Sequence, residues 1–317
     1  MALKLSDYRT TVFNDWCPGC GNFGILTSLQ MALSELELQP SRVAIFSGIG
    51  CHGKTPHFMN AYGVHTLHGR ALPFAIGTKL ANPELEVIVH GGDGDGLGIG
   101  AGHFVNTGRR NLDMTYIIHD NGVYGLTKGQ ASPTLKLGVQ TKAMPKPNIN
   151  EGVNPIALGL AAGYTFIARS YCYDVGDLKE TIKNAIHKGM ALVIVQQWCP
   201  TYQHKRMVQW RRPDRPCDRK TIPRLYKLEE SGYDGVVRKP EEIIPKTIAA
   251  LTRSYEWGDK IPIGVFYKNE LISTYQERIS ERITNYLKFP PEKQMIADST
   301  GKSITSIKKM LDELKVT

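Results

Sequence analysis

The chain has 317 residues, of which 41% are hydrophobic and 22% are charged. This length suits one large α/β domain with an appendage, and this composition excludes wholesale disorder. The formal net charge of +9 is typical of an ordinary solvated basic surface and also suits an acidic protein partner, and the charge does not choose between them. Nucleic acid is not indicated, because the sequence carries neither zinc-finger spacing nor an RNA-binding aromatic motif.

The sequence gives no sign of a membrane segment or of export. Its longest apolar runs, such as 114–118 and 192–195, are far too short to cross a bilayer. The first residues lack the apolar core of a signal peptide, so a cytoplasmic protein is expected. In that compartment, the six cysteines indicate thiols or metal ligands rather than structural disulfides.

Buried strands alternate with helices over the first 200 residues. This alternation predicts an α/β fold with a parallel sheet that carries helices on both faces. The predicted elements are, in chain order, a helix over 23–36, a strand over 43–46, a helix over 72–80, strands over 87–90 and 114–119 separated by a helix over 100–107, a strand over 165–168, a helix over 175–188 and a strand over 192–196.

The character of the sequence changes near residue 200. Residues 203–224 are crowded with Lys, Arg and Pro, and they predict a long surface excursion. A helix over 241–254, a strand over 261–267 and a terminal helix over 302–314 are predicted after it. We expect residues 1–200 to form the main domain and residues 201–317 to form an extension that is not an independent domain.

The most informative motif is the loop that follows the strand over 87–90. Its glycines let backbone N–H groups close on an anion, and Asp93 at the strand end can hold a divalent cation. Asn121 follows the next strand, so one helix and one strand bring it back beside the first loop. Oxygen ligands of this kind suit Mg²⁺. A Gly-rich loop alone is also an ordinary turn, but the spaced Asn makes the pair much more specific.

Two other interpretations of this Gly-rich loop, as a Walker phosphate loop or as a dinucleotide-binding loop, fit poorly. The Walker phosphate loop is absent, and a dinucleotide fingerprint would place acidic residues against pyrophosphate without a cation between them. The loop of Gly92, Asp93 and Gly94 with Asn121 resembles the thiamine diphosphate motif of transketolases, decarboxylases and 2-oxoacid oxidoreductases. The longer strings LGIGAGHF and DNGVYGLTKGQASPT resemble the β subunit of 2-oxoacid:ferredoxin oxidoreductases.

This resemblance implies specific contacts with the cofactor. Mg²⁺ is expected to bind Asp93, the Asn121 side chain and the Val123 carbonyl. The residues expected to line the diphosphate are Gly94, Asp95, Gly125 and Leu126, and His68 is expected to contact thiamine diphosphate. Without the resemblance, the sequence around His68 indicates only a histidine in a surface loop.

The cysteines allow several interpretations. Cys17 and Cys20 form a CPGC motif, which suits a redox dithiol, half of a zinc site or part of an iron–sulfur site. Cys51 and Cys199 each follow a predicted strand, and each is alternatively a small buried hydrophobe. Cys172 and Cys217 fit a ligand role less well. The resemblance implies that Cys17, Cys20, Cys51 and Cys199 bind one [4Fe–4S] cluster.

The loop that contains Cys51 holds further candidates. Ile49 and Gly50 are expected to contact the cofactor, His52 to contact it and act in catalysis, and Lys54 to pair with a substrate carboxylate. Lys128 is expected to face the substrate. His103 and His119 are expected to be structural.

The family implies the coenzyme A-dependent oxidative decarboxylation of 2-oxoacids to acyl-CoA and CO₂, with electrons passed through the cluster to ferredoxin. It also implies a partner, the alpha (or fused gamma-alpha) subunit, which supplies the carboxylate that activates the aminopyrimidine. Two alternatives stay open: a non-oxidative thiamine-dependent decarboxylase or synthase subunit, and a non-catalytic iron–sulfur electron-transfer protein. The preferred 2-oxoacid is not determined by the sequence.

Overall fold

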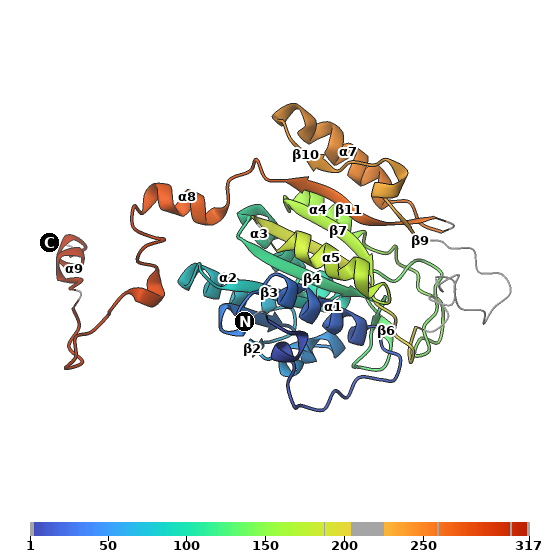
Figure 1. Cartoon of the computed structure of the whole chain (residues 1–317), viewed down its shortest axis with the longest axis horizontal. Coiled ribbons are helices and arrows are strands. Elements are labelled where there is room, and N and C mark those ends of the chain that lie inside the picture. The colour runs from blue at the N-terminus through green and yellow to red at the C-terminus, as the bar shows by residue number, and fades with distance from the viewer. Residues whose placement is uncertain (1–2, 187, 204–224, 259, 305, 316–317) are drawn as a thin grey trace.

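The computed structural model describes residues 3–186, 188–203, 225–258, 260–304 and 306–315. Their centre is a nine-stranded sheet in the order β10-β11-β7-β8-β4-β3-β1-β2, with β9 paired to β11 (Figure 1). The strands from β7 to β2 are parallel, as predicted. They are β1 (Val43–Ser47), β2 (Tyr62–His65), β3 (Glu86–Gly92), β4 (Met114–Asp120), β7 (Phe166–Tyr171) and β8 (Met190–Gln196).

Helices cover both faces of this sheet, because most of its strands are apolar on both sides. β1, β4 and β8 are buried along their whole length. One core packs Ile45, Ile117 and Val193 against α1 and α5, and the other packs Phe46, Ile118 and Ile194 against α2, α3 and α4. These helices are α1 (Asn22–Glu35), α2 (Ala71–Ala81), α3 (Ala101–Arg110), α4 (Pro155–Ala162) and α5 (Val175–Ala185).

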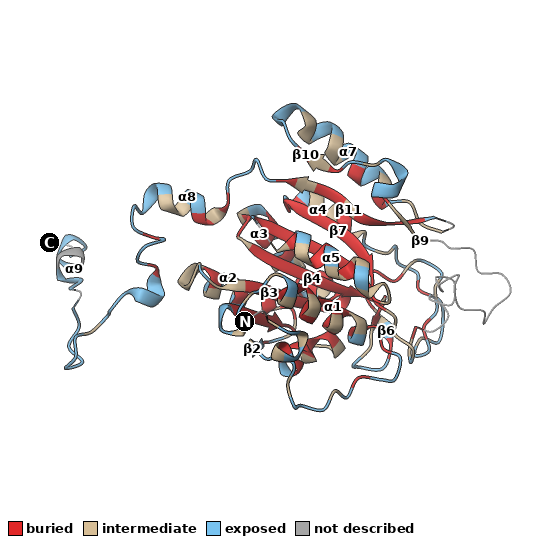
Figure 2. Ribbon diagram, viewed as in Figure 1, coloured by how far each residue is buried: buried red, intermediate tan, exposed pale blue. Residues whose placement is uncertain are grey.

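The C-terminal third adds strands to the same sheet. β11 (Ile261–Asn269) pairs antiparallel with β7 and parallel with β9 (Leu225–Lys227) and β10 (Val236–Val237). α7 (Ile243–Ser254) packs on β11, beside α4. Beyond β11, the chain leaves the body through α8 (Tyr275–Arg282) and ends in α9 (Lys308–Glu313) (Figure 1). Figure 2 shows that this last part is mostly exposed.

Every strand and helix expected in the first 200 residues is present, with shifts of a few residues at the ends. The helix expected over 175–188 stops at Ala185, and the terminal helix expected over 302–314 forms only between Lys308 and Glu313. The excursion expected over 203–224 lies outside the described residues, except for Gln203. No helix in the described ranges is long and apolar enough to span a membrane.

Candidate functional site

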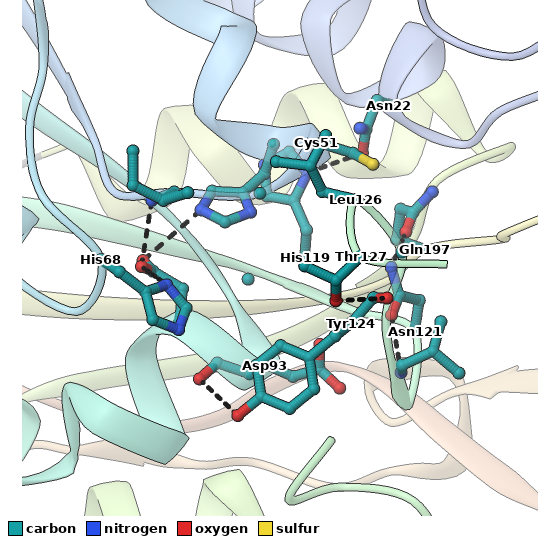
Figure 3. A pocket seen from close by; sticks show the side chains of 18 residues that line it. Asn22, Cys51, His68, Asp93, His119, Asn121, Tyr124, Leu126, Thr127 and Gln197 are labelled. Carbon is teal, nitrogen blue, oxygen red and sulfur yellow. Dashed lines mark hydrogen bonds and ion pairs between the residues drawn. The ribbon is translucent and has the colours of Figure 1, made fainter. Parts of the chain in front are cut away.

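A cavity of about 330 Å³ opens at the carboxyl ends of four neighbouring strands, β1, β3, β4 and β8. This volume lies within the range of small-molecule and cofactor sites. Ligands of parallel α/β sheets bind at this edge. Side chains from all four strand ends point into it (Figure 3). Its lining includes twelve residues expected from the sequence: Ile49, Gly50, Cys51, His52, His68, Asp93, Gly94, Asp95, Asn121, Val123, Gly125 and Leu126.

Asp93 lies at the end of β3, and its side chain is 1% exposed. Its Oδ2 accepts hydrogen bonds from the Gly122 amide (2.8 Å), the Thr134 hydroxyl (2.5 Å) and the Ser132 hydroxyl. The bond to Gly122 joins the loop after β3 to the loop after β4, as expected from the sequence. Since the three donors converge on Oδ2, the other carboxylate oxygen remains for a cation.

The surroundings of Asp93 oppose its negative charge. Burial raises the pKa of this carboxyl to about 6, and repulsion from Asp120 adds to the shift. The three hydrogen bonds act in the opposite direction but do not cancel it. A buried carboxylate in this state gains from a bound cation, which compensates the charge that burial penalises.

Asn121 lies in the next loop, and backbone and side-chain partners fix its amide. Its Oδ1 accepts from the Val123 amide at 2.9 Å, and its Nδ2 donates to Gln197 Oε1 at 2.6 Å (Figure 3). Gln197 directly follows β8 and is 2% exposed. Three strand ends therefore contribute to one polar cluster: Asp93 from β3, Asn121 from β4 and Gln197 from β8.

Asp95 connects the two histidine loops of the site. Its Oδ1 accepts from the amides of Ile49 (3.1 Å) and Gly69 (2.7 Å) and lies 3.0 Å from His68 Nδ1. Its Oδ2 lies 3.4 Å from His52 Nε2. Burial raises the pKa of Asp95, but the interaction with His52 and the hydrogen bonds from the two amides lower it by more, so the net pKa is below the usual value. This carboxylate lies within ion-pair distance of both imidazoles, and neither His52 Nε2 nor His68 Nδ1 has a hydrogen-bond partner among the described residues.

Glycines make room for the rings of the site. A Cβ at Gly92 would lie 2.8 Å from His52 Nδ1, and one at Gly94 would lie 2.3 Å from Tyr124 Cε1. The Tyr124 hydroxyl donates to the Gly94 carbonyl at 3.2 Å (Figure 3). The Gly-rich loop is therefore required by ring packing as well as by close backbone approach.

A line of buried polar side chains leads from the cavity into the sheet. His119 lines the cavity and pairs with Asn22 Oδ1 and with His90 Nδ1, both at 2.9 Å. Burial lowers the pKa of His90 to about 3, so this imidazole is neutral. Asn22 Nδ2 is buried at the cavity without a hydrogen-bond partner, which makes it a donor that a ligand would satisfy.

The four expected cluster cysteines lie together beside this cavity. A Cβ at Gly125 would lie 3.4 Å from Cys51 Sγ and 4.0 Å from Cys199 Sγ. Burial raises the pKa of Cys20 to about 12, and Cys51, Cys199 and Cys17 each add repulsion. The five cysteines in the described part of the chain are free thiols.

Contacts between distant segments fix this arrangement. The Gly21 amide donates to the Trp198 carbonyl at 3.0 Å, and the Tyr173 hydroxyl donates to the Gly19 carbonyl. Trp16 Nε1 donates to the Cys51 carbonyl at 2.7 Å. Within the ranges described above, no group of three or more His, Cys, Asp or Glu side chains could hold a single metal ion. A cluster does not need such a group, because each of its irons takes one thiolate.

Other expected residues lie away from the cavity lining. Lys54 Nζ pairs with Asp15 at 2.6 Å. Lys128 is exposed, with a positive φ of 80°, in the loop that also holds Leu126. Cys172 is fully buried and accepts from the Trp198 amide at 3.5 Å, and Cys217 lies outside the described residues.

Several lining residues were not expected from the sequence. His119 was expected to be structural, and the others not singled out for the site are Asn22, Tyr124, Thr127 and Gln197. The sequence positions of two of them could have indicated the site. Gln197 directly follows a buried strand, and Asn22 lies two residues after the CPGC motif.

Comparisons with known proteins agree with this geometry. Residues 48–195 match the family model of the thiamine pyrophosphate enzyme, C-terminal TPP binding domain. The fold and the cavity thus define a thiamine diphosphate-binding enzyme domain. Residues 222–282 match a second family model, which describes the C-terminal part of the pyruvate ferredoxin oxidoreductase beta subunit. The chain belongs to the family of 2-oxoacid:ferredoxin oxidoreductase beta subunits, as its sequence predicted, and is part of such an enzyme.

Three similar proteins match this chain over more than nine tenths of their own length. The 2-oxoacid:ferredoxin oxidoreductase subunit beta of Saccharolobus solfataricus is 59% identical over 96% of this chain and 98% of its own. Subunit beta of 2-oxoacid:ferredoxin oxidoreductase 1 of Aeropyrum pernix is 52% identical over 95% of this chain and 92% of its own. Among solved structures, the 2-oxoglutarate:ferredoxin oxidoreductase from Magnetococcus marinus with 2-oxoglutarate, coenzyme A and succinyl-CoA bound matches with a TM-score of 0.78. The sequence identity is 33%, and the match covers 99% of this chain and 97% of that chain.

Proposed function

We propose that this chain, together with an alpha (or fused gamma-alpha) subunit, performs the coenzyme A-dependent oxidative decarboxylation of 2-oxoacids and passes the electrons to ferredoxin. The observation that carries the proposal is the adjacency of two sites: Gly125 lines the thiamine cavity and lies against the sulfurs of Cys51 and Cys199. A thiamine site alone suits any decarboxylase. An electron acceptor directly beside it suits oxidation of the decarboxylated substrate.

The residues of the cavity fit Mg²⁺ and a diphosphate. Asp93 and the Asn121 amide supply hard oxygen ligands, and the Val123 carbonyl is placed in the same loop. Burial penalises the negative charge of Asp93, as its raised pKa shows, and a bound cation would compensate that charge. The buried Nδ2 of Asn22 has no hydrogen-bond acceptor in the described part of the chain and could donate to the ligand. When bound, thiamine diphosphate would supply the electron sink for loss of CO₂.

The cysteine group fits a [4Fe–4S] cluster. Buried thiols with raised pKa values stay protonated and repel one another once ionised. Iron reverses this preference, because a coordinated thiol is deprotonated outright. Cys17, Cys20, Cys51 and Cys199 would be its four ligands, and Cys172 stays a buried thiol under the CPGC loop.

The remaining side chains would orient the cofactor and the substrate. Asp95 holds His52 and His68 at the cavity wall. Lys54 and Lys128 are proposed to reach the substrate side of the cavity, for which Lys54 would have to leave Asp15. None of these side chains is the carboxylate that activates the aminopyrimidine, and we assign that carboxylate to the partner subunit.

The test is an assay of ferredoxin reduction by the assembled complex with a 2-oxoacid and coenzyme A. The Asp93→Asn complex is expected to lose Mg²⁺-dependent thiamine binding and activity together. The control is Asp113→Asn, just before the other end of β4, where the carboxylate accepts from the Gly189 amide; it is expected to keep both. Ferredoxin reduction that persists in Asp93→Asn, or CO₂ release with no electron transfer in the unmodified complex, would contradict the proposal.

A further inference from the structure

Gln197 connects the cation-binding loop to the cysteine group through one side chain. Its Oε1 accepts from Asn121 Nδ2 at 2.6 Å. Its Nε2 donates to Cys20 Sγ at 3.3 Å and to the Trp198 carbonyl at 2.6 Å. Its backbone amide donates to the Asp120 carbonyl at 2.9 Å, which anchors it at the end of β4. The side-chain oxygen and nitrogen therefore both have partners in a buried position.

Backbone groups at both ends determine which way this amide points. The Trp198 carbonyl accepts only, so it requires the Nε2 of Gln197 on its side. The Val123 amide donates only, so it requires the Oδ1 of Asn121 and turns Nδ2 toward Gln197. A flip of either side chain would place two donors or two acceptors face to face, which is costly in a buried site.

We propose that Gln197 is a positioning residue with two roles: it tunes the reduction potential of the cluster by donating to Cys20, and it holds the Asn121 amide in its cation-binding orientation. This inference rests on the proposed function. It follows from the bonds of a single side chain, which has one end at each of the two sites.

The direction of the first role follows from charge. Reduction adds one negative charge to the cluster and its thiolates, and a donor to a ligand sulfur stabilises the reduced form more than the oxidised form. Loss of the donor therefore lowers the potential. A tenfold fall in the one-electron reduction equilibrium constant corresponds to about 59 mV, and a shift of this order is expected.

Two substitutions separate the two roles. Gln197→Met keeps the size but removes donor and acceptor, so both the potential and Mg²⁺-dependent thiamine diphosphate affinity are expected to fall, the affinity several-fold. Gln197→Glu keeps an acceptor for Asn121 but no donor for Cys20. Its second carboxylate oxygen also faces the Trp198 carbonyl and Cys20, so it is expected to lower the potential more than Gln197→Met does, while the acceptor for Asn121 keeps the loss of thiamine affinity smaller than in Gln197→Met. The matched control is Gln30→Met, a buried glutamine in α1 that donates only to the carbonyls of Tyr8 and Phe58.

The experiment uses the assembled holoenzyme under anaerobic conditions. The potential is measured by redox titration with electron paramagnetic resonance, and thiamine diphosphate binding by calorimetry after removal of the cofactor. Lower potentials in both Gln197 variants, with Gln30→Met unchanged, support the proposal. Full iron content with an unchanged potential overturns it. Loss of iron from both variants but not from Gln30→Met also overturns it, in favour of a purely structural role. Absence of iron from the unmodified enzyme would instead refute the proposed function.

Discussion

Replacement of Gly94 by alanine tests the packing of the candidate site. Gly94 has φ −69° and ψ −36°, which any residue adopts, so alanine causes no backbone strain there. The cost must come from the new Cβ, which would lie 2.3 Å from Tyr124 Cε1 and 2.7 Å from its Cδ1. Overpacking of this kind costs about 1–3 kcal/mol in the free energy of unfolding. Because Tyr124 lines the cavity, thiamine diphosphate affinity is expected to fall as well.

The assay is urea unfolding of a double-mutant cycle, with thiamine diphosphate binding as the second readout. Removal of the ring in Tyr124→Ala is expected to abolish most of the cost of Gly94→Ala. The control is Gly77→Ala in α2, where a Cβ meets no atom within 4 Å. This variant is expected to gain about 0.5–1 kcal/mol, because alanine is the better helix former. If Gly94→Ala costs the same with and without the tyrosine ring, the packing argument is refuted.

Three further predictions concern acid stability, the cysteines and the cation site. His90 has a pKa of about 3 when folded and 6.5 when unfolded, so the unfolded state binds more protons between these values. The contribution of His90 to the free energy of unfolding is fully present above pH 6.5 and falls by about 1.4 kcal/mol for each pH unit below it. Urea unfolding of His90→Phe at pH 5–7 should therefore show a smaller change of unfolding free energy with pH, and an equal change would contradict this. Cys199→Ser is expected to lose cluster iron while Cys172→Ser keeps it; the opposite result in iron analysis would reassign the ligands. Thr134→Val removes a donor to Asp93, which raises its pKa further above about 6, so calorimetry should find Mg²⁺-dependent thiamine binding shifted to higher pH, and an unshifted profile would exclude this role.

The central sheet could be predicted because its strands are apolar on both faces and end in Gly, Asp or Cys motifs. β2 was missed because its four residues are all exposed and show no alternation. α4 was missed because it is short and apolar throughout, without the spacing of an amphipathic helix. The terminal helix begins later than expected, because Ser and Ile before Lys308 are weak helix formers and Ser303 instead forms a β-bridge with Ala297.

The candidate site was predicted where it depends on the ends of neighbouring strands. Asp93 and Asn121 follow adjacent strands of the sheet, so their meeting follows from topology. Gln197 and Asn22 act through contacts with side chains far away in the sequence, which no local pattern encodes. The ion pair of Lys54 with Asp15 is likewise a matter of tertiary placement. The division of the chain near residue 200 stays a prediction.

Whether both cofactors are present is decided by a joint analysis of iron, acid-labile sulfide and thiamine diphosphate in the anaerobically purified complex, with its visible absorption spectrum. We expect thiamine diphosphate together with about four irons per beta chain, held by its four cysteines, and broad absorption near 400 nm. These irons should be lost in Cys51→Ser, because that sulfur lies against the cavity at Gly125. A complex that holds thiamine diphosphate and Mg²⁺ but no iron in this chain would refute the oxidoreductase function and identify a non-oxidative thiamine enzyme.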